Sequence, residues 1–311
     1  MTVKNASMRY MHYYLHFPQR IQAAGIAEVS LEIPHMQRAF NWSIAFQNQY
    51  VPDFWNAAKD LLMNYGFWHV FIDWGRKSLL ILQDLEYTED EAWLRSDLGW
   101  LAMEQNQFPA AHHLFLTALD EFQQSENLDG ICTLERYLGV LKYRMGDLTQ
   151  ADEHVSKSLC IANMEKFEGK VALALDLKGS IARKRQQYDL ARRFYRESIE
   201  RLANLEKDSN MILVKRNLAR LECQEGYFSK AKSLYLEILK ECERLHRMDA
   251  LYGCQVCLAE VEIELGYLEN AHLLLTLARE GFIQLGMHHD LELVGKILQK
   301  LSSTASTARR K

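Results

Sequence analysis

Small and apolar residues recur along this chain at a fixed interval of 40 residues. One series consists of small residues, at Gly99, Gly139, Gly179, Ala219 and Ala259. A series of alanines follows it twelve residues later, at Ala111, Ala151, Ala191, Ala231 and Ala271. Four positions further on stands a large or branched apolar residue, at Phe115, Val155, Tyr195, Tyr235 and Leu275. A period of roughly 20 to 50 residues is typical of stacked structural repeats, so the pattern predicts a repeat protein.

Within each repeat the apolar positions have the spacing of α-helices. In the first repeat they fall three or four residues apart, at Ala111, Phe115, Ala118 and Phe122. A short turn separates two such stretches, and three of these turns contain glycine, at Gly146, Gly226 and Gly266. Glycine favours the left-handed backbone that ends many helices. We therefore predict five helical hairpins over residues 89–286, each burying its apolar face against its neighbours.

The segments before the repeats follow the pattern less closely. Residues 1–52 have a helical pattern rich in aromatic residues and predict an N-terminal helical cap. In this cap we expect Pro18 to help end one helix and Pro34 to begin another. Residues 53–88 predict a degenerate repeat. Some of its residues keep the 40-residue spacing (the phase), but the series of recurring alanine and large apolar residues (the columns) are interrupted. The phase is kept at Gly66 and Trp68 and the columns are broken at Phe71 and Gly75.

The chain after the fifth repeat differs again. Residues 287–301 carry one apolar stripe, which includes Leu291, Val294, Leu298 and Leu301. This stripe predicts an amphipathic helix that covers the open end of the stack. Residues 302–311 are polar and small, and they predict a disordered tail.

The columns resemble those of the tetratricopeptide repeat (TPR) family. The resemblance rests on the small residue, the alanine, the large apolar residue and a further position three residues later, at Ala118, Ser158, Ser198, Ile238 and Ala278. The commonest TPR unit has about 34 residues, and the longer unit here resembles a subtype found in bacterial signalling proteins. Lys178, which replaces a leucine, and the large Ile238 depart from the pattern. The resemblance implies an all-α fold, a right-handed TPR-like α-solenoid of helical hairpins with a C-terminal capping helix.

A second resemblance covers one helix near the N-terminus. The segment Ile33–Ser43 contains an arginine, an alanine, an aromatic residue and a tryptophan in close succession. It resembles the helix that links the ATPase module to the helical repeats in bacterial STAND-type signalling ATPases. No GxxxxGK[ST] phosphate-binding loop occurs in the sequence. This resemblance therefore implies the repeat or sensor region of such a protein without its ATPase motor.

Composition and charge exclude some classes of function. With 37 basic and 41 acidic residues the net charge is −4, so nothing global indicates nucleic acid as a partner. No apolar run reaches the length that crosses a membrane. The six cysteines have no disulfide-framework spacing, so we expect reduced thiols and a cytoplasmic location.

Few residues suggest chemistry. Cys254 and Cys257 have CxxC spacing but lie inside a predicted helix, which favours structural thiols over a redox or zinc site. The pairs His112–His113 and His288–His289 point to different faces of a helix, which disfavours a metal site. No nucleophile with a base, nucleotide loop or pair of inward carboxylates stands out. We therefore expect no enzymatic activity, no cofactor and no metal.

The inner face of the predicted solenoid is the strongest candidate site. In the long-unit TPR subtype, the first helix of each hairpin lines this face at fixed offsets from its small residue. Those offsets give a basic and partly aromatic centre: Arg136, Tyr143, Arg144, Arg183, Lys184, Arg216, Asn217 and Arg220. Guanidinium groups on rigid helices form forks for carboxylates. The resemblance also implies that Asn217 holds the backbone of a bound peptide.

The sequence leaves three interpretations of these residues open. The first is a scaffold or adaptor that binds a protein or peptide, with an acidic segment or a C-terminal carboxylate as the bound group. The second is a peptide-responsive sensor, similar to STAND proteins or quorum-peptide regulators, that changes conformation on binding. The third is an ordinary solvated surface whose charges Asp97 and Asp176 partly neutralise. The first 50 residues lack a clear helix-turn-helix, which disfavours a DNA-binding version of the sensor.

Overall fold

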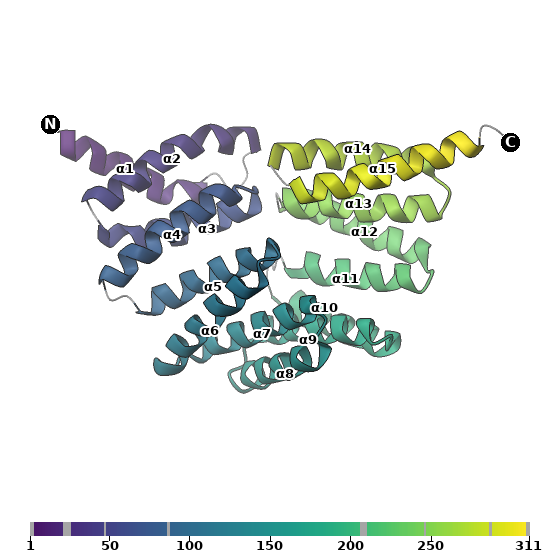
Figure 1. The fold of residues 1–311 in the computed structure, drawn as a ribbon, viewed down its shortest axis with the longest axis horizontal. Helices are drawn as coiled ribbons and strands as arrows, with labels where there is room; N and C mark the ends of the chain where they lie inside the picture. Colours follow the sequence, from purple (N-terminus) through teal and green to yellow (C-terminus); the bar gives the residue numbers. More distant parts are fainter. Residues whose placement is uncertain are drawn as a thin grey trace. The chain divides into compact units, whose positions relative to one another are not determined.

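The structure is a computed structural model that describes residues 3–20, 26–46, 48–85, 88–205, 210–245, 247–285 and 288–308. Over these ranges the chain forms fifteen α-helices and one short 3-10 helix (Figure 1). No helix among them is long and apolar enough to cross a membrane. Consecutive helices pack as hairpins, so the predicted all-α fold is confirmed.

The chain divides into two compact units. Unit 1 comprises Met1–Leu61 and His69–Asp208, and unit 2 comprises Leu62–Trp68 and Ser209–Lys311. Before the five repeats the helices are α1 (Val3–Arg20), α2 (Ile26–Phe46), η1 (Asn48–Tyr50), α3 (Val51–Asn64) and α4 (Trp68–Leu85). The first three repeats form α5 (Thr88–Glu104), α6 (Phe108–Gln124), α7 (Leu128–Met145), α8 (Leu148–Met164), α9 (Glu168–Lys184) and α10 (Tyr188–Ala203). Unit 2 continues with α11 (Asn210–Gln224), α12 (Phe228–Arg244), α13 (Met248–Glu264), α14 (Leu268–Leu285) and α15 (His288–Ala308).

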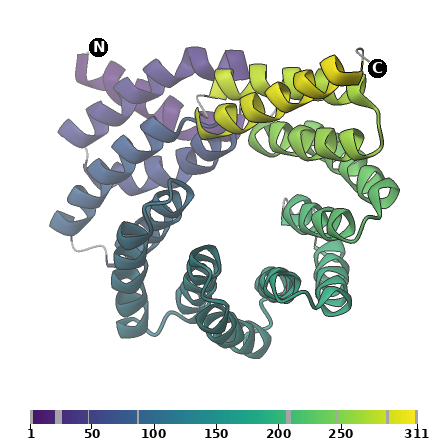
Figure 2. The same ribbon diagram turned by 45° about the vertical axis from the view of Figure 1, so that its right-hand side comes forward.

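The 40-residue columns are the packing positions of these hairpins. All five residues of the alanine column have 0% exposure, and the column of Phe115 is exposed by at most 1%. The small residues allow the two helices of a hairpin to approach closely. An ideal Cβ added at Gly179 of α9 would lie only 2.7 Å from Cε1 of Tyr195 in α10. Figure 2 shows the helix pairs of unit 1 following one another from α5 to α10, in blue to teal.

Each hairpin turns through one residue with a left-handed backbone. The positive φ angles are 75° at Gly66, 59° at Asn106, 88° at Gly146, 60° at Gln186, 79° at Gly226 and 84° at Gly266. These positions are 40 residues apart, so the turn between α3 and α4 keeps the phase of the five repeats. Glycine adopts this conformation without the steric cost that a Cβ brings.

The N-terminal helices differ from the prediction at their prolines. Helix α1 continues two residues past Pro18, and α2 begins at Ile26, so Pro34 lies inside a helix that it was predicted to start. A proline inside a helix costs about 3 kcal/mol. Val29, Met36 and Phe40 of α2 are fully buried while Pro34 is exposed. Burial of that apolar face offsets the cost of the proline.

The hairpin of α3 and α4 packs differently from the others at Gly75, which stands in the column of Phe115. A Cβ at Gly75 would lie 3.1 Å from Cη2 of Trp55. The Trp55 ring also meets the Phe71 ring edge-on, with 4.6 Å between centroids. Leu98, whose Cδ2 would lie 2.8 Å from the same Cβ, and Trp55 therefore occupy the space next to Gly75.

Helix α15 ends unit 2. Val294 and Leu301 are buried against a cluster that includes Phe282 of α14. The helix continues to Ala308, although the sequence predicted disorder from Ser302 onwards. The added turns contain serine, threonine and alanine but no glycine or proline, and alanine has the highest helix propensity. Residues 309–311 of the predicted tail lie outside the described residues.

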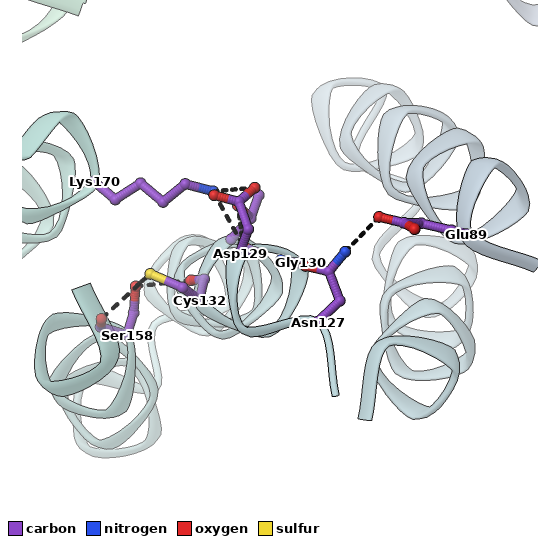
Figure 3. A network of polar contacts seen from close by, with 8 residues as sticks. Glu89, Asn127, Asp129, Gly130, Cys132, Ser158 and Lys170 are labelled. Carbon is purple, nitrogen blue, oxygen red and sulfur yellow. Dashed lines mark hydrogen bonds and ion pairs between the residues drawn. The ribbon is translucent and has the colours of Figure 1, made fainter. Parts of the chain in front are cut away.

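Polar side chains join the two helices of one hairpin and also join successive hairpins in unit 1 (Figure 3). Ser158 Oγ in α8 donates to the backbone carbonyl of Cys132 in α7 at 2.8 Å. Lys170 Nζ in α9 donates to the backbone carbonyl of Asp129 at 3.0 Å and pairs with the Asp129 carboxylate at 2.9 Å. The first contact satisfies buried polar groups within one repeat, and the second joins half-buried polar groups across the boundary to the next repeat.

Candidate functional site

The first helices of successive repeats contact one another directly. Helix α7 contacts both α5 and α9 in unit 1, and α11 contacts α13 in unit 2. The second helices α6, α8 and α10 make no comparable contacts with one another. Because the first helices are closer together, each unit curves with these helices on its inner side. The predicted candidate residues all belong to first helices.

Arg136 of α7 lies against two aromatic rings. Its guanidinium carbon is 4.7 Å from the ring centroid of Tyr137 and 6.0 Å from that of Trp100 in α5. The two rings pack on each other at 4.8 Å. A cation–π contact contributes about 0.5–1 kcal/mol at exposed sites and more when desolvated. Arg136 is therefore positioned by aromatic rings on two adjacent first helices.

Tyr143, Arg183 and Lys184 form a second group in unit 1. Arg183 of α9 donates to Tyr143 Oη of α7 at 3.1 Å, and Lys184 Nζ lies 5.2 Å from the Tyr143 ring centroid. The Tyr195 hydroxyl from α10 bonds Ser180 at 3.1 Å. Burial disfavours the Arg183 charge, but Tyr143 and Tyr195 together raise its pKa above the ordinary value. Arg183 is thus held by two phenol groups.

Acidic residues engage part of the positive charge in unit 1. Arg144 pairs with Glu104 of the preceding first helix at 2.6 Å, so Arg144 is an ion-paired residue. Asp97 pairs instead with Lys59 of α3 at 3.2 Å. Burial raises the Asp97 pKa, and Lys59 opposes that effect. Among the predicted groove arginines, the solvated-charge interpretation therefore fits Arg144 best.

Three predicted residues lie on α11 of unit 2. Arg216 and Asn217 are half-buried, and Arg220 is exposed. Arg216 Nε is buried and has no hydrogen-bond partner. Arg220 lies close enough to Glu260 of α13 to affect it: burial raises the Glu260 pKa, and the Arg220 charge opposes that rise.

Sequence reasoning missed three residues that shape the inner face of unit 1. Lys59 and Trp55 both contact Asp97, and Trp55 Nε1 donates to its carboxylate at 3.3 Å. Lys59 stands 40 residues before Gly99, so a lysine in the small-residue column was the available signal. Tyr195 was assigned to packing alone. Its signal was a hydroxyl in a fully buried column, because a buried tyrosine hydroxyl needs a partner.

The cysteines show no arrangement for metal binding or disulfide formation in the described chain. All six are free thiols, and no group of three or more His, Cys, Asp or Glu side chains there could hold a metal ion. Burial raises the pKa of Cys132, Cys223 and Cys257. Protonated buried thiols are poor nucleophiles.

Comparison with known proteins identifies the class of fold. No protein-family model matches the sequence, and no curated protein matches it. A Rap protein complexed with competence and sporulation factor aligns with a TM-score of 0.66 and 13% identity, over 99% of this chain and 89% of that chain. NprR in complex with its cognate peptide NprX aligns with a TM-score of 0.66 and 15% identity, over 97% of this chain and 89% of that chain.

A STAND protein with a tetratricopeptide repeat sensor, from Pyrococcus horikoshii, is also similar. It aligns with a TM-score of 0.58 and 15% identity over 92% of this chain, which spans 42% of that protein. At these identities the likeness shows the fold alone. The chain therefore has a TPR-like repeat fold, shared with these signalling proteins, as the sequence predicted.

Proposed function

We propose that this chain binds a peptide, or an extended segment of a partner protein, along its first helices without catalysing a reaction. The observation that carries the proposal is the pair of cation–aromatic groups in unit 1. Arg136 lies on Trp100 and Tyr137. Lys184 lies over the Tyr143 ring, and Arg183 donates to the Tyr143 hydroxyl. These side chains are half-buried or exposed, so they remain accessible.

The chemistry of these groups fits a peptide that carries carboxylates. Aromatic rings supply contact area at a low cost in side-chain entropy, and guanidinium groups donate charge-assisted hydrogen bonds to acidic groups. Because rings already position the cations, binding does not have to order them. An acidic segment or a C-terminal carboxylate is therefore the group that we expect the face to recognise.

The solved structures of similar fold favour the same class of ligand. The Rap protein was solved with competence and sporulation factor, and NprR with its cognate peptide. NprR is also described as a quorum sensor, and the STAND protein carries a repeat sensor. These similarities support a second candidate function for this chain, a regulator that changes conformation when a peptide binds.

Selection from a displayed library of random 12-residue peptides tests the binding proposal. We expect peptides that bind saturably by fluorescence anisotropy. Arg136→Ala and Trp100→Ala should each weaken binding by about one to two orders of magnitude, since a desolvated charge-assisted contact or an aromatic anchor contributes about 1.5–3 kcal/mol. Lys157→Ala is the matched control, because Lys157 lies on the second helix α8 and its side chain is 62% exposed.

Two results would contradict binding at this face. One is a library that yields no saturable binder, and the other is an equal loss in Lys157→Ala and Arg136→Ala. Small-angle scattering with a selected peptide then separates the two candidates. A sensor is expected to change its radius of gyration or oligomeric state, whereas a scaffold keeps both.

A further inference from the structure

The basic residues of unit 1 already have partners within the protein. Arg144 pairs with Glu104, Arg183 donates to Tyr143, and Arg136 stacks on aromatic rings. The Nε of Arg183 is buried without a hydrogen-bond partner, but its Nη2 donates to Tyr143, whereas the two arginines of α11 in unit 2 make no such bond within the described chain. In the part of the chain that the structure describes, neither Arg216 nor Arg220 has an ion pair or a ring contact, and Arg216 Nε is buried without an acceptor. The Nη atoms of Arg216 are not buried in this way, so their donors can reach an acceptor from outside the chain.

The two guanidinium groups belong to one face of α11 and lie within electrostatic reach of one residue of α13. Arg216 and Arg220 are four residues apart on one helix, which puts them on the same face. Helix α11 contacts α13, and both arginines act electrostatically on Cys257 of α13. Two cations on one helix face repel each other, and an anion bound between them would offset that repulsion.

One acidic side chain competes for this place. Glu260 of α13 is near enough to Arg220 to feel its charge, but the two form no ion pair in the structure. The carboxylate of Glu260 is therefore a weak internal substitute that an incoming anion would have to displace. Neutralising Glu260 should therefore strengthen the binding of an oxyanion by the two arginines.

We propose that Arg216 and Arg220 form an oxyanion site that binds a carboxylate or phosphate group of the ligand peptide. The inference rests on the proposed function, because it assigns one chemical group of the ligand to one place in unit 2. Two arginines offer planar forks of donors that match the oxygen pairs of either group. The shared chemistry is a compact oxyanion, and its source is an acidic residue, a chain terminus or a phosphorylated side chain.

Anisotropy with defined peptides tests the site. The probe is a fluorescein-labelled hexaglutamate peptide, with hexaglutamine as its uncharged counterpart and a hexapeptide containing phosphoserine as a second oxyanion source. We expect hexaglutamate to bind saturably and hexaglutamine not to bind. Arg216→Ala and Arg220→Ala should each weaken hexaglutamate binding about tenfold, the effect of one lost charge-assisted hydrogen bond.

Two further variants make the test specific to this place. Lys215→Ala removes the same charge from the adjacent residue, whose ammonium group pairs with Glu237 at 3.2 Å, and should change affinity less than about twofold. Glu260→Gln should tighten binding, because it removes the competing carboxylate. A variant that simply fails to fold cannot produce tighter binding, and circular dichroism verifies folding of all four.

The possible outcomes distinguish a failure of the oxyanion site from a failure of the proposed peptide binding. Equal binding of hexaglutamate and hexaglutamine, an equal loss in Lys215→Ala, or weaker binding in Glu260→Gln would overturn the oxyanion site. Library-selected peptides that still bind in that case leave the proposed function standing. Tighter binding of the phosphoserine peptide than of hexaglutamate supports the site with phosphate as the source, and the reverse order supports it with carboxylate.

Discussion

The close approach of α9 and α10 at Gly179 makes the variant Gly179→Ala a stringent test of the packing. An ideal Cβ there would lie 2.7 Å from Cε1 and 2.8 Å from Cδ1 of Tyr195. Tyr195 is fully buried, and its hydroxyl bonds Ser180 at 3.1 Å. The ring cannot move away without losing that bond, so α9 and α10 must separate.

Two opposing effects set the magnitude. Alanine in place of glycine stabilises a helix by about 1 kcal/mol, and an overpacked methyl group costs about 1–3 kcal/mol. Gly253→Ala on α13 provides the reference, because no atom lies within 4 Å of a Cβ at that position. The difference between the two variants removes the helix-propensity effect. We expect Gly179→Ala to be the less stable of the two by about 1–3 kcal/mol.

Thermal unfolding followed by far-ultraviolet circular dichroism measures this difference. For a chain of 311 residues, 1 kcal/mol changes Tm by about 1.5 °C. The same substitution in a Tyr195→Val background supplies a second check, since Val155 occupies the equivalent position of the preceding repeat. There the new methyl group has room, so Gly179→Ala should cost less. An equal cost in both backgrounds would refute the assignment of the clash to the Tyr195 ring.

Two further predictions concern ion pairs of unit 1. Burial alone would raise the pKa of Asp152, but hydrogen bonds from Lys178 and Arg185 lower it below its ordinary value. Asp152→Asn should therefore lower the free energy of unfolding by up to about 1 kcal/mol at neutral pH. Urea titrations should show this difference between the variant and the unmodified chain shrinking as the pH falls below about 4. A difference that grows in acid would contradict the lowered pKa. For Glu104 and Arg144, whose side chains are about one-third exposed, a double-mutant cycle should give a coupling below about 1 kcal/mol. A coupling of several kcal/mol would mean that the pair is desolvated.

The repeat was predictable because equivalent positions are buried in every repeat. A fully buried alanine every 40 residues is recognisable in the sequence whatever the local secondary-structure propensities are. The prediction failed at Pro34, where a local rule about helix starts competed with tertiary packing. Val29 and Phe40, on either side of that proline, are buried, and their packing outweighs the helix-breaking tendency. Such a balance depends on neighbouring helices that the local sequence does not specify.

The sequence predicted which helices carry the candidate residues, but only some of the contacts that these residues make. The pairing of Arg144 with Glu104 joins equivalent positions of successive repeats, so the 40-residue period was enough to predict this contact. The contact of Arg183 with Tyr143 follows the same relation. By contrast, the buried Nε of Arg216 depends on side-chain conformations that no spacing rule specifies.

The constant 40-residue distance between the left-handed turns within the hairpins limits how the length of this chain can change. An α-helix rotates by about 100° per residue. A single residue inserted in α11 ahead of Arg216 would turn both of its arginines away from α13 or shift every later turn out of phase. Duplicating or deleting a complete 40-residue block keeps the remaining blocks in step. The chain can therefore lengthen or shorten in whole blocks and keep its contacts, whereas a change of one or two residues within a helix disrupts everything beyond it.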